Sequence, residues 1–116
     1  MVAPPGYADA EPEFSARSIA HISPSSGACY SGFLCLYRDP GFRGGGYAIR
    51  EGVDLNDFRA FFFNDEMSSW VNATRLRYCW FPDINFSGAF EVMPAGGSGP
   101  LLHPWRDNTA SALADC

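Results

Sequence analysis

The sequence contains a tandem repeat, and this repeat constrains the fold more than any other feature. An aromatic residue, four residues, a second aromatic residue, one residue and a glycine occur at 37–44 and again at 81–88. A polar six-residue segment occurs at 64–69 and again at 107–112, with nearly the same offset. Self-similarity at a fixed period of this length indicates two copies of one supersecondary unit that share a core.

Each copy is predicted to form β-strands. Segments 33–37 and 76–81 are short, apolar or aromatic, and bounded by residues that favour turns. Alternation of side chains across a strand places four of their residues on the core-facing sides: Leu34, Leu36, Tyr78 and Trp80. Further strands are expected at 46–50, 68–72, 89–93 and 111–115, with a helical turn within 55–63. About eight strands in two repeats predict an all-β sandwich of two sheets.

Length and charge exclude several classes of function. A chain of 116 residues forms one small domain. All eight basic residues are arginine, so Schiff-base catalysis by lysine and phosphate binding by a P-loop lysine are excluded. The formal net charge of −5 has the wrong sign for a protein that binds nucleic acid or an anionic membrane. The chain has no run of about 18 apolar residues, so no membrane-spanning segment is expected.

The N-terminal region and the cysteines point to secretion. Residues 1–28 are rich in Pro, Ser and acidic residues and are predicted to form a flexible leader. Four cysteines in a short chain with 12 Gly and 9 Pro indicate two disulfides in an oxidising compartment, for which three pairings are possible. Four reduced thiols would instead require a cytosolic protein. We therefore expect a secreted, extracellular protein.

The two polar segments are candidate cation sites. They begin at Asn64 and Asp107, and each offers several side-chain and backbone oxygens just before a predicted strand. A Ca²⁺ ion takes about six to eight oxygen ligands, which such segments can supply. A single segment of this kind is more typical of a turn whose side chains bond their own backbone. Two copies in matching positions favour cation binding.

The sequence lacks the pattern of an enzyme. Neither His21 nor His103 lies in a catalytic motif, and the cysteine and histidine spacing does not fit a zinc site. Acidic pairs such as Asp54 and Asp57 are more typical of solvated or cation-directed loops than of acid–base catalysis. We expect no enzymatic activity.

These repeated motifs resemble a known family. The aromatic–glycine motif followed by the polar segment, twice in tandem, is the pattern of the microbial βγ-crystallins. The Cys29 to Cys35 spacing and the segment 68–72 are most similar to the secreted actinobacterial branch classed as peptidase inhibitor family I36. The resemblance covers 29–116. It implies one βγ-crystallin domain built from two Greek keys, 29–75 and 76–116, with two Ca²⁺ ions held in paired clamps.

The resemblance also implies a set of Ca²⁺ ligands from both loops. Arg38 and the neutral amide of Asn108 would lower the negative charge of the ligand set, so we expect two sites of unequal affinity. The expected ligands comprise side chains of both polar loops, the backbone carbonyl groups of the third loop residues, and carbonyl groups after the first motif aromatics. In chain order the candidate residues are Arg38, Asn64, Asp65, Glu66, Ser68, Pro82, Asp107, Asn108, Thr109 and Ser111.

The cysteine positions also predict a disulfide pairing, and the family resemblance implies a function. Cys29 and Cys35 enclose a short loop before the first strand, and Cys79 lies in the matching strand of the second copy, so we predict Cys29–Cys35 and Cys79–Cys116. The family implies a monomeric inhibitor of an extracellular peptidase, specifically a metallopeptidase. A killer-toxin-like antimicrobial module and a purely structural Ca²⁺-stabilised protein are the alternatives.

Two segments are candidates for contacting a peptidase. A rigid and exposed loop could enter a peptidase cleft. The candidates are residues 95–101 and the aromatic run 61–63. The first is also typical of an ordinary hairpin loop, and the second is also typical of a buried core segment.

Overall fold

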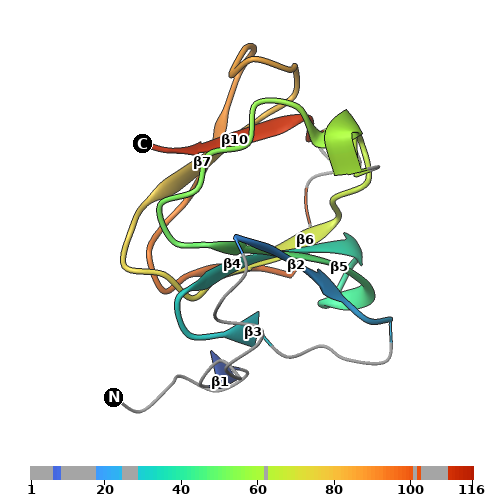
Figure 1. Ribbon diagram of the computed structural model, residues 1–116, viewed down its shortest axis with the longest axis vertical. Coiled ribbons are helices and arrows are strands. Elements are labelled where there is room, and N and C mark those ends of the chain that lie inside the picture. The colour runs from blue at the N-terminus through green and yellow to red at the C-terminus, as the bar shows by residue number, and fades with distance from the viewer. Residues whose placement is uncertain (1–6, 9–17, 25–28, 62, 101, 103–109) are drawn as a thin grey trace.

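The computed structural model is an all-β protein of two facing antiparallel sheets (Figure 1). It describes residues 7–8, 18–24, 29–61, 63–100, 102 and 110–116. Its elements, in chain order, are β1 (Tyr7–Ala8), β2 (Ile19–Ile22), β3 (Cys29–Tyr30), β4 (Phe33–Asp39), β5 (Arg43–Arg50), the 3-10 helix η1 (Phe58–Phe61), β6 (Ser69–Asn72), β7 (Tyr78–Phe81), β8 (Glu91–Met93), β9 (Ser98–Gly99) and β10 (Ala112–Asp115). The predicted all-β sandwich is confirmed.

The two sheets differ in size. The larger sheet has the order β2-β5-β4-β6-β9, and the smaller has the order β10-β7-β8. In Figure 1 the smaller sheet lies above the larger one, and the parallel pair β1-β3 lies on the far side of the larger sheet. Among the described residues, no helix has the length and apolar character that a membrane span needs.

The main hydrophobic core lies between the two sheets. All four residues predicted to face it, which are Leu34, Leu36, Tyr78 and Trp80, have no exposed surface. They pack with further buried residues of both sheets and of the loops before β6 and β10: Ile49, Phe58, Phe63, Met67, Trp70, Met93, Ala110 and Leu113. The alternation of apolar residues along the strands therefore identified the core face correctly.

The two repeats exchange segments. Leu55 of the first repeat and Leu113 of the second exchange backbone hydrogen bonds, both 2.8 Å from nitrogen to oxygen. In return β9, from the second repeat, pairs with β6 of the first. Each sheet thus contains backbone from both repeats, so the repeats fold as one unit.

The structure differs from the expected flexible leader at Ile19–Ile22. This segment is β2, an edge strand paired with β5, and its Ala20 and Ile22 are buried. The pairing depends on a glycine, because a Cβ atom at Gly45 would lie 2.5 Å from the carbonyl oxygen of Ile22. The apolar alternation over these four residues is too weak to predict a strand. The strand with which they pair lies more than twenty residues away in the sequence. The other leader residues, apart from 7–8 and 18–24, lie outside the described residues.

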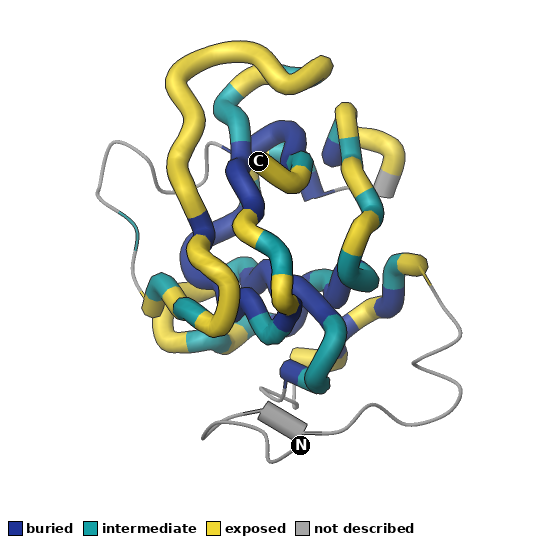
Figure 2. The backbone as a smooth tube through the Cα atoms, turned by 90° about the vertical axis from the view of Figure 1, so that its left-hand side faces the viewer, coloured by how far each residue is buried: buried dark blue, intermediate teal, exposed yellow. Residues whose placement is uncertain are grey.

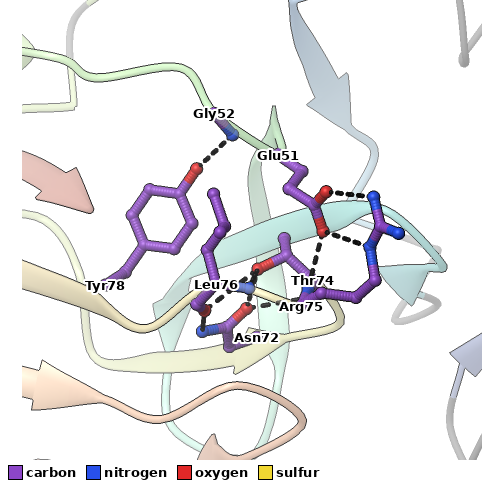
Figure 3. A network of polar contacts seen from close by, with 7 residues as sticks. All are labelled: Glu51, Gly52, Asn72, Thr74, Arg75, Leu76 and Tyr78. Carbon is purple, nitrogen blue, oxygen red and sulfur yellow. Dashed lines mark hydrogen bonds and ion pairs between the residues drawn. The ribbon is translucent and has the colours of Figure 1, made fainter. Parts of the chain in front are cut away.

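Asn72, at the end of β6, ties the two sheets together from a fully buried position (Figure 3). Its Nδ2 group donates hydrogen bonds to the carbonyl oxygens of Leu76, at 2.9 Å, and Met93, at 2.8 Å. Its Oδ1 atom accepts from the backbone N–H of Thr74, at 3.1 Å, and from the Thr74 hydroxyl, at 2.7 Å. Because Met93 belongs to β8, this amide fixes the smaller sheet to the end of a strand in the larger one.

We predict that Asn72→Ala lowers the free energy of unfolding by about 3 kcal/mol, because the buried carbonyl of Met93 and the backbone N–H of Thr74 lose their hydrogen bonds to this side chain. Chemical denaturation measures this change. Arg75→Ala is the matched control: its side chain is 86% exposed and pairs with Glu51 at 2.9 Å, so its loss should change the stability far less. Equal losses for the two variants would contradict the prediction.

Tyr78 makes the stability sensitive to alkaline pH. Its ring is buried, and its hydroxyl oxygen accepts a 2.6 Å hydrogen bond from the N–H of Gly52 (Figure 3). Burial raises the pKa of Tyr78 above its ordinary value, and the nearby carboxylates of Asp54, Asp115 and Glu51 act in the same direction. The folded state therefore holds the phenol proton more tightly than the unfolded chain does.

We predict that the free energy of unfolding falls as pH rises above about 10, the ordinary pKa of tyrosine, and continues to fall up to the raised pKa of the folded state. Tyr78→Phe should flatten this decline because it removes the titrating group. Urea unfolding at a series of alkaline pH values measures the slope. An unchanged slope in Tyr78→Phe would show that another group dominates the alkaline transition.

Candidate metal centre

The first polar loop lies beside the described end of the second, residues 110–112. The backbone N–H of Asp65, in the first loop, donates a 2.8 Å hydrogen bond to the carbonyl of Ala110, in the second. Each loop is also held by its own repeat through an equivalent bond. Ser68 donates its N–H to the carbonyl of Tyr37, and Ser111 donates to that of Phe81, both at 2.8 Å. The sequence repeat therefore corresponds to a structural repeat.

Three oxygen atoms from separate segments converge beside the second loop. The hydroxyl of Ser111 lies 2.9 Å from the carbonyl oxygen of Pro82 and 3.3 Å from Oδ1 of Asp65. Two ligand oxygens that share one Ca²⁺ ion at about 2.4 Å also lie about 3 Å apart when they are neighbours. The spacing of these three atoms is thus compatible with a shared cation.

The chemistry of this donor set also suits a hard cation. The Ser111 hydroxyl has a single hydrogen, so it can satisfy only one of its two neighbouring acceptors at a time. Asn64, next to Asp65, has a buried Oδ1 atom that no donor among the described residues reaches. No group of three or more His, Cys, Asp or Glu side chains that could hold a metal ion occurs within the part of the chain that the structure describes. A cation here would be held by mixed carboxylate, hydroxyl and carbonyl oxygens, which Ca²⁺ accepts and softer metals do not favour.

Two residues of the other expected site form an ion pair. Arg38 donates from Nε to Oε1 of Glu66 at 3.0 Å, and its guanidinium lies over the rings of Tyr47 and Phe63 at 5.7 and 5.2 Å. The neighbouring Ser68 is buried. The remaining residues predicted for this site and its loop, which are Asp107, Asn108 and Thr109, lie outside the described residues.

The motif glycines are required by close packing in the turns that lead to these sites. A Cβ atom at Gly88, where φ is +93°, would lie 2.6 Å from Cγ of Pro82. At Gly44, where φ is +80°, it would lie 2.5 Å from the carboxylate of Asp39. A side chain at either position would push the turn open, so the spacing of aromatic and glycine residues is a packing constraint.

The disulfides join Cys29 to Cys35 and Cys79 to Cys116, which is the pairing expected from the sequence. The first connects β3 to β4, and the second connects β7 to the end of the chain after β10. Cys29, Cys35 and Cys79 are buried, and each bond is anchored on the middle strand of a sheet, β4 or β7, where it limits separation of the segments that it joins.

The two candidate peptidase-contacting segments have different environments. Phe63 is fully buried in the core, so this part of the aromatic run serves packing. The 95–100 part of the other segment is exposed or partly exposed and includes β9. Three further residues are large, apolar and exposed, although no sequence pattern predicted their exposure: Phe86, Phe90 and Val92. Comparison of the two repeats position by position could have identified Phe90, because the matching residue of the first repeat is Gly46.

The profile of peptidase inhibitor family I36 matches residues 23–93. The chain belongs to this family. Its members are peptidase inhibitors and not enzymes, which agrees with the absence of catalytic motifs from the sequence. No curated protein matches the chain.

Solved structures show the fold independently. A βγ-crystallin domain described under the evolution of the eye lens fold superposes with a TM-score of 0.73 and 22% identity, over 85% of this chain and 97% of that one. A βγ-crystallin from Ciona intestinalis has a TM-score of 0.61 and 25% identity, over 73% and 100%. A domain from Flavobacterium johnsoniae has a TM-score of 0.61 and 19% identity, over 74% and 94%. The chain therefore has the βγ-crystallin fold.

Proposed function

We propose that this protein is a secreted, monomeric inhibitor of an extracellular metallopeptidase, stabilised by Ca²⁺. The observation that carries the inhibitory function is the family match over residues 23–93. Two disulfides in a chain of 116 residues support an oxidising, extracellular location.

The architecture supports inhibition by a rigid surface. The repeats exchange segments, and a disulfide connects strands at each sheet. A surface that is already ordered loses little conformational entropy when it binds, so more of the contact energy contributes to affinity. This is the property that a peptidase inhibitor needs in order to occupy a cleft without being unfolded and cleaved.

Binding of Ca²⁺ is supported by the convergence of Asp65, Pro82 and Ser111. These residues come from both repeats, so an ion between them would connect the two loops and oppose separation of the repeats. We further propose that this centre binds more tightly than its counterpart near Arg38, where the carboxylate of Glu66 is already neutralised by a guanidinium group.

We predict that Ca²⁺ raises the melting temperature. At a concentration about 100-fold above the dissociation constant, a ligand that binds only the folded state adds about 2.7 kcal/mol. For a domain of this size that corresponds to a rise of roughly 10 °C. Thermal unfolding with Ca²⁺ and with chelator measures the shift, and calorimetric titration measures the binding.

Asp65→Asn removes the carboxylate of the candidate centre with little change in shape, and should weaken the tighter site at least tenfold. Asp57→Asn is the control, since Asp57 directly precedes η1 and its carboxylate is already paired with Arg59 at 2.7 Å. Equal Ca²⁺ affinity in the two variants would exclude Asp65 as a ligand. No heat of binding and no chelator effect in the unaltered protein would exclude Ca²⁺ altogether.

We also predict stoichiometric inhibition of a metallopeptidase of the thermolysin type, measured by peptide hydrolysis at increasing inhibitor concentration. Subtilisin and chymotrypsin serve as serine peptidase comparisons. Each enzyme is tested at the Ca²⁺ concentration that its own stability requires, and again without Ca²⁺. Inhibition of the serine peptidases alone would overturn the metallopeptidase assignment. Inhibition of none of them, together with growth arrest of fungi or bacteria, would favour an antimicrobial function instead.

A further inference from the structure

We propose that the peptidase is bound by an apolar patch on the outer face of β7 and β8. The patch consists of Phe81, Phe86, Phe90 and Val92. This inference rests on the proposed inhibitory function and assigns it a surface. The partner it fits is a peptidase whose cleft has an apolar pocket for an aromatic side chain and a basic rim.

The patch contains the large apolar side chains that are exposed in the described part of the chain. Across the described residues, the large hydrophobic side chains that remain exposed are Phe86 at 42%, Phe90 at 53% and Val92 at 38%. They belong to one run of exposed residues, 85–92, which forms a continuous arc at the top of Figure 2. Apolar side chains concentrated in one place on a small soluble domain mark an interaction surface.

The equivalent face of the larger sheet is covered. There the outward side chains of Phe33, Cys35, Tyr37 and Ala48 are buried in a second hydrophobic cluster. Residues of β2 and β3 complete that cluster, including Ala20, Ile22, Cys29 and Tyr30. The smaller sheet has no such cover among the described residues, so Phe90 and Val92 face solvent where their counterparts face protein.

The fold does not require large apolar residues at these positions. In β5 the residues that pair with Tyr37 and Cys35 are Gly46 and Ala48. In β8 the residue that pairs with Cys79 is Val92, so the repeat places Phe90 where the first copy has Gly46. A Cβ atom at Gly46, where φ is +153°, would collide with the backbone carbonyl oxygen of Leu36 on the paired strand β4, so the first copy cannot carry a side chain there. The second copy has an aromatic ring at that position and leaves it exposed.

The turn that presents Phe86 is held in one conformation. Asn85 and Phe86 have positive φ values of 59° and 58°, which cost energy for residues other than glycine and persist only where contacts enforce them. The tip is fixed by Asn56 of the first repeat, whose carbonyl accepts from the N–H of Asn85 at 2.7 Å and whose Nδ2 donates to Asn85 Oδ1 at 3.1 Å. A bridge between Asp83 and Ser87 closes its base.

The aromatic rings of the patch support one another. The Phe81 ring lies 5.8 Å from the ring of Phe86, in an edge-to-face arrangement, and 5.8 Å from that of Phe90. The rings are thus positioned before a partner arrives, which lowers the entropy lost on binding.

Charge around the patch defines the partner further. Asp83 and Glu91 are exposed beside it, and the chain has no Arg between Arg77 and Arg106 and no Lys at all. An apolar surface with an acidic border complements an apolar pocket with a basic rim, and this charge pattern would also speed association at low salt.

The test compares Phe86→Asn and Phe90→Ser with Phe42→Asn. Asparagine tolerates positive φ, so the first variant keeps the turn. Phe42 is the matched control because it is the second aromatic of the first repeat, has a φ of 64°, and packs on Tyr37 as Phe86 packs on Phe81. Inhibition constants are measured against thermolysin, subtilisin and chymotrypsin, with circular dichroism to verify the fold and sedimentation to measure self-association.

We expect each patch variant to raise the inhibition constant at least tenfold while Phe42→Asn changes it less than threefold, as for an aromatic residue at the centre of an interface. If the unaltered protein inhibits and the patch variants inhibit equally well, the peptidase binds elsewhere and this inference fails while the inhibitory function stands. If the unaltered protein inhibits none of the enzymes, the inhibitory function fails and the partner named here falls with it. Self-association that the patch variants abolish would identify a second copy as the occupant and overturn the inference.

Discussion

The exchange of segments between the two repeats is the contact on which the rest of the structure depends. Leu55 bonds to Leu113 in both directions, and β9 completes the sheet of the other repeat beside β6. Neither repeat alone can cover its apolar strand faces, because part of each sheet comes from the other half. The same exchange brings the first polar loop against Ala110, so the core and the candidate cation centre are formed by one assembly step.

The two sheets contain equivalent strands of the two repeats, but their outer faces have different surroundings. The larger sheet is buried on both sides, with the second hydrophobic cluster and the Cys29–Cys35 disulfide on its outer face. The smaller sheet is buried on one side and presents Phe86 and Phe90 on the other. The exposed outer face of the smaller sheet is therefore the side that is available for a binding surface. A small domain can therefore combine a fixed scaffold with an exposed apolar patch.

Much of the fold could be predicted from local patterns. Alternation placed Leu34 and Trp80 correctly in the core, and the repeat of aromatic and glycine residues located the tight turns that end at Gly44 and Gly88. The polar loops were found because they recur at matching positions. The strand Ile19–Ile22 was missed, since its stability comes from pairing with β5 and from the space left by Gly45 rather than from its own composition.

By itself the sequence determined where most strands of the two repeats lie, which side of β4 and β7 is apolar, and where glycine must stand in the repeated turns, because these properties depend on residues close together in the chain. Only the tertiary structure decided which surface covers each apolar side. It joined Asp65 to Ser111 across the repeats, buried Asn72 at their junction, and left Phe90 in solvent. Such contacts join segments far apart in the chain, so their geometry follows from how the two sheets pack and not from any local pattern.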